Sequence, residues 1–131
     1  MKVIYIAELW PQENGNGYYV KVPDIDGCVT TGKDLMDAVL MARDALSVCL
    51  CAMEDHAEAI PPARAMEDLP REEGHIYTLI DVDTTKYRAE TDTRAVRKNV
   101  SIPAWMDALV TRKGINCSQV LQEALRNAFG E

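Results

Sequence analysis

The chain has 131 residues, of which 47% are hydrophobic, and carries a formal net charge of −7 at pH 7. This length allows one domain or two small ones, and no apolar run approaches the ~18 residues that a membrane-spanning helix needs. The N-terminus enters strand-like alternation directly, without the pattern of a signal peptide, so we expect a cytoplasmic protein with no membrane partner.

The charge is divided unevenly along the chain. Residues 94–131 carry six basic and three acidic side chains, a net charge of +3, whereas residues 1–93 carry eight basic and eighteen acidic ones, a net charge of −10. This asymmetry indicates an acidic body that suits a basic protein partner and a basic tail that suits nucleic acid. The alternative is a solvated acidic surface with no specific partner.

Residues 1–83 predict a small α+β domain of β-β-β-α-β order. Segments with alternating apolar side chains indicate strands, and the helix is marked by apolar side chains at helical spacing after Asp34, a suitable N-cap. Between the helix and the last strand the periodicity stops, which indicates an irregular surface segment. The first three strands are expected at residues 3–9, 18–22 and 28–31, and the helix at residues 35–53. The irregular segment is expected at residues 56–75, and the last strand at residues 76–82.

The rest of the chain predicts a linker and a small second domain. Residues 84–94 are polar and threonine-rich and are assigned to the linker. Residues 95–131 begin with a strand that presents Arg97, Asn99 and Ser101 on one face and apolar side chains, interrupted by Lys98, on the other. Pro103 opens a helix over 104–113, Gly114 ends it, and a second helix starts near Asn116.

This second domain is too small to bury an adequate core as a monomer, so we expect a homodimer or a higher even-numbered oligomer. Two copies can pair their strands into an antiparallel ribbon, which fits the major groove of double-stranded DNA. Arg97, Asn99 and Ser101 would then read bases, and the helix N-terminus at Cys117 and Ser118 would bind phosphate. A strand that serves dimerisation alone is the alternative.

The tail sequence resembles the ribbon-helix-helix family of DNA-binding proteins through the segment RKNVSIPAWMDALVTRKGINCSQVLQEAL. In that family the outward strand residues read bases and the second helix's N-terminus holds the DNA backbone. The resemblance implies base-reading roles for Arg97, Asn99 and Ser101, and phosphate contacts at Asn116, Cys117 and Ser118. Lys98 departs from the usual apolar inward position, and its aliphatic stem could lie against the core.

The N-terminal sequence resembles the HicB antitoxin family. The resemblance is carried by GYYVKVPDIDGCVTTGKDLMDAVLMARDAL, AEAIPPA and LIDVDTTKYRA, in the family's order. It implies a partial ribonuclease-H-like domain that binds and inhibits HicA, a small basic toxin that cleaves messenger RNA. It also implies that the tail represses the operon of this type II pair at an inverted-repeat operator. Tentative toxin contacts are Asp24, Leu40, Met41 and Asp44.

The sequence allows two other interpretations. Asp24, Asp26, Asp81 and Asp83 form two carboxylate pairs, and ribonuclease-H-type sites hold two metal ions with carboxylates. The first pair lies in a Pro/Gly turn, where Asp favours local hydrogen bonds, and the domain lacks the further elements of such a site. We therefore expect no enzyme activity, metal or cofactor. The second alternative is a ribbon-helix-helix regulator whose N-terminal domain senses a ligand.

The four cysteines show no CxxC pattern and no histidine at zinc-binding spacing. With no sign of secretion, they are expected to pack as small core residues rather than to form disulfides or bind metal. Neither His56 nor His75 lies beside a candidate nucleophile.

Overall fold

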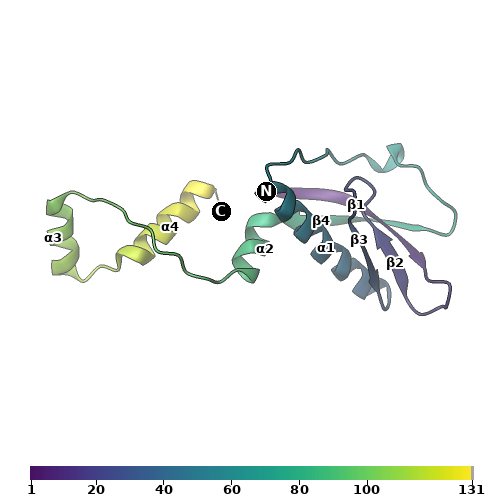
Figure 1. The fold of residues 1–131 in the computed structure, drawn as a ribbon, viewed down its shortest axis with the longest axis horizontal. Helices are drawn as coiled ribbons and strands as arrows, with labels where there is room; N and C mark the ends of the chain where they lie inside the picture. The colour runs from purple at the N-terminus through teal and green to yellow at the C-terminus, as the bar shows by residue number, and fades with distance from the viewer. Residues whose placement is uncertain (131) are drawn as a thin grey trace. The chain divides into compact units, whose positions relative to one another are not determined.

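The computed structural model describes residues 1–130, and the chain divides after Arg94 into two compact units, unit 1 (Met1–Arg94) and unit 2 (from Ala95 onward). Unit 1 contains a four-stranded antiparallel sheet in the order β3-β2-β1-β4, and α1 lies across one face of it (Figure 1). The α+β class predicted from the sequence is confirmed. The elements are β1 (Lys2–Pro11), β2 (Tyr18–Lys21), β3 (Val29–Gly32), α1 (Leu35–Asp55), η1 (Met66–Asp68), β4 (Ile76–Asp83), α2 (Thr84–Thr91), α3 (Ala104–Lys113) and α4 (Cys117–Phe129).

Strand β1 is central and pairs with both β2 and β4. Because side chains alternate along a strand, Tyr5, Ala7 and Leu9 point to the α1 side and are almost fully buried. Ile80, opposite Tyr5 on β4, lies in the same core. The core of unit 1 consists of Tyr5, Ala7, Leu9, Val20, Val22, Ile25, Cys28, Ala38, Ala42, Leu46, Leu50, Ile80 and Val82.

Helix α1 begins where the sequence predicts it. The Asp34 side chain accepts a hydrogen bond from the Asp37 amide at 2.8 Å, as an N-cap does. Ala38 and Ala42 are completely or almost completely buried, and small side chains there let the helix approach the sheet closely. The close approach is tightest at Gly32, where an added Cβ would lie 2.4 Å from the Ala38 backbone.

The segment between α1 and β4 is irregular apart from η1, as expected. It is tied to the sheet and its turns at several points. The Tyr5 hydroxyl donates to the Pro61 carbonyl, and Arg64 donates to the Asp24 carboxylate from its side chain at 2.5 Å and from its amide at 2.9 Å. Leu69 is 6% exposed. The segment is therefore part of the packed unit.

The segment assigned to a linker, residues 84–94, contains helix α2 over Thr84–Thr91. Asp83 caps this helix by accepting from the Lys86 amide at 3.2 Å. Arg88 joins α2 to α1 through ion pairs with Asp55 at 2.9 Å and Glu54 at 3.3 Å. The helix is held mainly by polar contacts, so its sequence carries no apolar stripe that would have revealed it. The boundary between the units lies after Arg94.

Unit 2 contains helices α3 and α4 but, among the described residues, no strand. The strand expected in the stretch 97–103 is absent from this single chain. A short strand needs a partner strand for its hydrogen bonds. Gly114 ends α3 in the left-handed conformation, with φ of 64°, and Asn116 caps α4 by accepting from the Gln119 amide at 3.2 Å. Neither helix has a buried residue.

Candidate functional site

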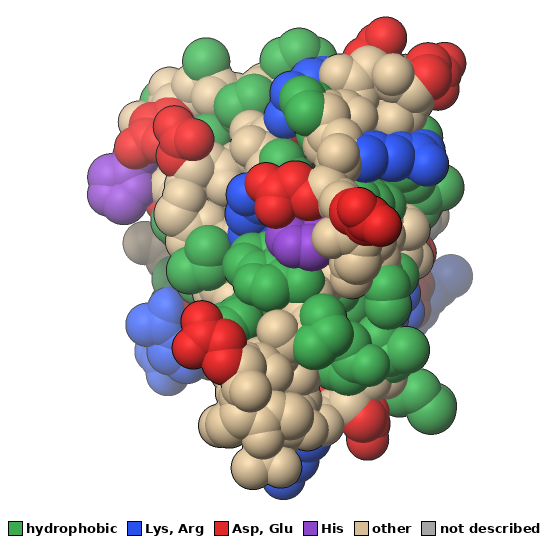
Figure 2. Space-filling model, turned by 90° about the vertical axis from the view of Figure 1, so that its right-hand side faces the viewer, with side chains coloured by type: hydrophobic (Ala, Val, Ile, Leu, Met, Phe, Trp, Pro, Cys, Tyr) green, Lys and Arg blue, Asp and Glu red, His purple; other side chains and the backbone are tan. Residues whose placement is uncertain are grey.

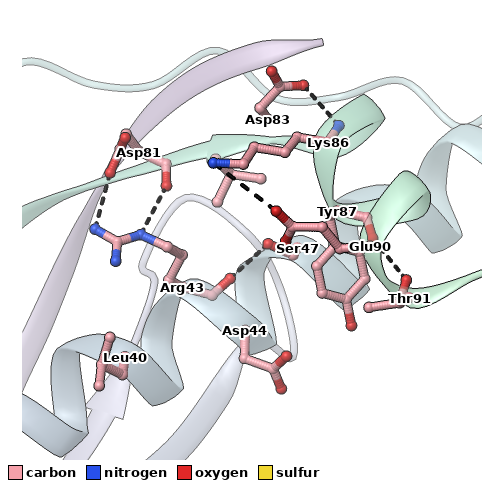
Figure 3. Close-up of a pocket in the computed structure, with 11 residues that line it drawn as sticks. Leu40, Arg43, Asp44, Ser47, Asp81, Asp83, Lys86, Tyr87, Glu90 and Thr91 are labelled. Atoms are coloured by element: carbon pink, nitrogen blue, oxygen red, sulfur yellow. Dashed lines mark hydrogen bonds and ion pairs between the residues drawn. The ribbon is translucent and has the colours of Figure 1, made fainter.

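A groove in unit 1 lies between α1, β4 and α2 and encloses about 660 Å³ (Figure 3). We call it the α1–α2 groove. Eleven residues from the three elements line it, and they include four carboxylates and two basic side chains. The lining residues are Leu40, Arg43, Asp44, Ser47, Asp81, Val82, Asp83, Lys86, Tyr87, Glu90 and Thr91.

Most charged groups of the groove already have partners. Arg43 spans from α1 to the edge strand β4, donating to the Asp81 carbonyl at 3.2 Å and to its carboxylate at 3.0 Å. Asp83 caps α2, and the Lys86 ammonium lies 4.0 Å from the Glu90 carboxylate. These contacts are drawn in Figure 3. They leave the groove with an excess of negative charge.

Asp44 differs from the other carboxylates of the groove. Within residues 1–130 no ion pair involves its side chain, which is exposed and lies beside the Tyr87 hydroxyl. Burial raises the pKa of the Tyr87 hydroxyl, and the negative charge of Asp44 raises it further, because the two groups are neighbours. Leu40, one helical turn before Asp44, is 60% exposed. A carboxylate without a cationic partner, an aromatic ring and an exposed aliphatic side chain thus line the same groove (Figure 3).

A second polar cluster lies on the sheet face that α1 does not cover. Glu8 is 3% exposed and accepts a hydrogen bond from the Tyr77 hydroxyl at 2.6 Å, with the Lys21 ammonium 3.2 Å away. The His75 ring stacks on Trp10 with a centroid distance of 4.9 Å. On the face in Figure 2, one histidine lies between acidic side chains and a patch of hydrophobic ones. This cluster joins the irregular segment to the sheet, which is a structural role.

Three of the four carboxylates considered for metal binding have other partners, and the fourth, Asp26, is exposed in its turn. Asp24 pairs with Arg64, Asp81 with Arg43, and Asp83 caps α2. No group of three or more His, Cys, Asp or Glu side chains in residues 1–130 could hold a metal ion. Of the cysteines, Cys28 and Cys51 are buried, whereas Cys117 at the start of α4 is exposed.

In unit 2, the predicted base-reading residues Arg97, Asn99 and Ser101 are exposed, and so are Val100 and Ile102 on the alternate positions. One chain therefore leaves both faces of this segment in solvent. The Asn116 side chain is occupied as the cap of α4, while Cys117 and Ser118 form its first turn. Backbone amides of a first helical turn have no partner within the helix and can bind an anion.

An apolar groove of about 560 Å³ also lies within unit 2. Lys98 and Ser118 are its polar members, and its other residues are hydrophobic. They come from the extended segment and both helices, namely Val100, Ile102, Met106, Leu109, Val110, Ile115, Cys117, Val120, Leu121 and Ala124. Apolar side chains of a folded domain are expected to be covered, so this groove lacks a covering element in the single chain.

The four tentative toxin contacts lie in different surroundings. Leu40 and Asp44 line the α1–α2 groove. Met41 is 39% exposed on α1 but does not line the groove, and the Asp24 side chain is 7% exposed and paired with Arg64. Tyr87 and Glu90 also line the groove, and they were not predicted because their segment was assigned to a linker. The signal that could have revealed α2 is Asp83 followed by Lys86 and Arg88, a cap with basic residues further along the helix.

Among the described residues, no helix is long and apolar enough to cross a membrane. A family described as HicB_like antitoxin of bacterial toxin-antitoxin system has a model that matches residues 5–125. An uncharacterized 14.9 kDa protein from the rep-hol intergenic region of Haemophilus phage HP1 (strain HP1c1) is 33% identical over 92 residues. The match spans 68% of this chain and 66% of the phage protein, just under two thirds of its length.

Two solved structures are similar to this chain. A toxin–antitoxin complex from Streptococcus pneumoniae has a chain with a TM-score of 0.63 and 20% identity, covering 98% of this chain and 99% of that one, which shows a shared fold. The HicA3 and HicB3 toxin–antitoxin complex has a chain with a TM-score of 0.52 and 29% identity, covering 62% of this chain and 99% of that one. Since the family match spans most of its length, this protein belongs to the HicB-like antitoxin family of bacterial toxin–antitoxin systems.

Proposed function

We propose that this protein binds and inhibits a HicA-type, messenger-RNA-cleaving toxin through unit 1. The observation that carries this proposal is the family match over residues 5–125. It is supported by the 29% identity to a chain of the HicA3–HicB3 complex, a similarity that covers 62% of this chain. The net charge of −10 over residues 1–93 suits a basic partner. Inhibition then requires binding of the toxin and no catalysis by the antitoxin.

We further propose that unit 2 is a dimeric ribbon-helix-helix domain, so that toxin binding and DNA binding are divided between Met1–Arg94 and Ala95–Glu131. The exposed apolar groove and the helices without buried residues support a second copy of the chain as its cover. In the dimer, segments 95–103 would pair as strands, and each chain would supply the strand hydrogen bonds that the other lacks.

We propose that this dimer represses its own operon by binding an inverted-repeat operator in the cytoplasm. Arg97, Asn99 and Ser101 read bases in the major groove, and Cys117 and Ser118 donate backbone amides to a phosphate at the start of α4. Asn116 contributes as the cap that keeps this first turn in place. The net charge of +3 over residues 94–131 favours association with DNA.

The test is co-expression of the chain with the short basic reading frame next to its gene. We expect rescue of cell growth from the toxin and a stable complex whose mass, measured after co-purification, fits an even number of antitoxin chains. Toxicity without rescue, together with no co-purified partner, would contradict the antitoxin proposal and favour a ligand-sensing regulator.

A further inference from the structure

The α1–α2 groove carries one feature that the proposed function does not itself require. Asp44 projects from α1 with no cationic partner among the described residues, and it lies beside the hydroxyl of Tyr87 on α2, whose ring forms the other wall of the groove (Figure 3). Both residues belong to unit 1, and α1 and α2 are fixed to each other by the ion pairs of Arg88 with Glu54 and Asp55. The distance between the two walls is therefore set before any partner arrives.

The lining of this groove matches one type of side chain. A carboxylate at the side of an aromatic ring suits a planar cation, which can pair with the acid while its face lies on the ring. The exposed Leu40, one helical turn before Asp44, adds an apolar surface on which an aliphatic stem can pack. Arginine has all three parts, namely the charge, the plane and the stem.

The other charges of the groove agree with a cationic occupant. Arg43 is held by Asp81, away from Asp44, and Lys86 is closest to Glu90. The remaining excess of acid over base within the groove favours a positive side chain over a neutral or negative one.

From this lining we infer that the α1–α2 groove binds an arginine side chain of the toxin. Asp44 is the ion-pair partner of this arginine, and Tyr87 is its stacking partner. The inference rests on the proposed function, and it adds the residue type that the toxin must supply. It also makes α2 part of the toxin interface, together with α1.

The experiment measures the dissociation constant between the full chain and the toxin encoded beside it, by isothermal titration calorimetry. We expect Asp44→Asn to weaken binding by about 10- to 100-fold, because a charge-assisted hydrogen bond is lost. Tyr87→Leu should weaken binding by about 3- to 30-fold through loss of the ring. The matched control is Asp26→Asn, at an exposed carboxylate in the turn before β3 that does not line the groove. It should leave the constant unchanged.

The toxin side is tested by replacing its arginines one at a time. Each toxin variant has one arginine changed to Met. For the arginine that occupies the groove, this change should weaken binding to the unmodified chain. The same change should not weaken binding to the Asp44→Asn variant any further, because its ion-pair partner is already absent. Thermal unfolding of each variant confirms that it is folded. If Asp44→Asn and Tyr87→Leu bind the toxin as the unmodified chain does, the groove assignment is overturned while the antitoxin proposal stands. If the unmodified chain does not bind the toxin, both are overturned.

Discussion

Glu8 is a buried carboxylate on the sheet face opposite α1, and its charge state affects stability. Burial raises the pKa of Glu8, but the hydrogen bond from Tyr77 and the nearby Lys21 outweigh it, so that the pKa lies below its ordinary value of 4.5. A carboxyl group whose pKa is lower in the folded state than in the unfolded state stabilises the fold above its unfolded pKa. That contribution is lost as the pH falls below about 4.5 toward the folded pKa.

We therefore expect Glu8→Gln to make unit 1 about 1–3 kcal/mol less stable at pH 7, because a hydrogen-bonded charge is removed. The difference from the unmodified chain should shrink as the pH is lowered from 5 to 3. Urea unfolding measures the free energy of unfolding of both proteins at each pH. It is followed by the fluorescence of Trp10, in a Trp105→Phe background that removes the other tryptophan. Glu13→Gln, in the exposed turn before β2, is the control. A difference that does not depend on pH would contradict the role given to the Glu8 charge.

Asn99 is the residue on which the base-reading proposal can be tested most directly. Asn99→Ala should weaken binding to the promoter region of its own operon by about 1–3 kcal/mol, the worth of one good base contact. The dimer should persist in sedimentation, since Asn99 alternates with Val100 and Ile102 along the segment and therefore lies on the face opposite the proposed dimer core. Asn127→Ala, near the end of α4, is the matched control. If the Asn99→Ala variant binds this DNA with unchanged affinity in a gel-shift titration, Asn99 does not read a base.

At the scale of elements, sequence and structure agree where a pattern is local. The alternation of β1 and the apolar spacing of α1 predicted both elements, and Asp34 marked the start of the helix. Two features depend on contacts between distant residues, although the Asp83 cap is a local signal for α2. Helix α2 is held by Arg88 and its acidic partners on α1, which are far away in the sequence. The lining of the α1–α2 groove depends on that packing, so Tyr87 could not be placed beside Asp44 from the sequence.

The packing of β3 against α1 gives a prediction about Gly32. A Cβ at this position would lie 2.4 Å from the Ala38 nitrogen and Cα and 2.7 Å from its Cβ. Most of these atoms belong to the backbone, so the strand and the helix would have to move apart. We expect Gly32→Ala to lower the free energy of unfolding of unit 1 by about 1–3 kcal/mol or more. Chemical denaturation measures this free energy, with Thr31→Ala on the same strand as the control. If Gly32→Ala and the unmodified chain are equally stable, the close packing of β3 against α1 is contradicted.

At the scale of the whole molecule, the two units differ in how they obtain a core. Unit 1 buries its own core, built from β1, β2, β4, α1 and the turn between β2 and β3. Unit 2 has helices without buried residues and an open apolar groove. With dimerisation as proposed, the stability of unit 2 depends on protein concentration, whereas the stability of unit 1 is a property of one chain.

Calorimetry of the full chain should therefore show two unfolding transitions. The transition of unit 2 should move to higher temperature when the protein concentration is raised tenfold, while that of unit 1 stays in place. Val100→Asp should abolish the concentration-dependent transition alone, since it places an unpaired charge in the proposed dimer core. A unit 2 transition that does not respond to concentration would contradict dimerisation through this unit.

The missing core of unit 2 also has a consequence for degradation. In a chain without a partner, the helices of unit 2 have no buried residues, so this unit should be cleaved by proteases before Met1–Arg94, which is protected by its own core. Cleavage would then leave a shortened fragment that still contains the whole α1–α2 groove but has lost Arg97 and Asn99. Such a fragment would keep the proposed ability to neutralise the toxin after it has lost the ability to silence the promoter.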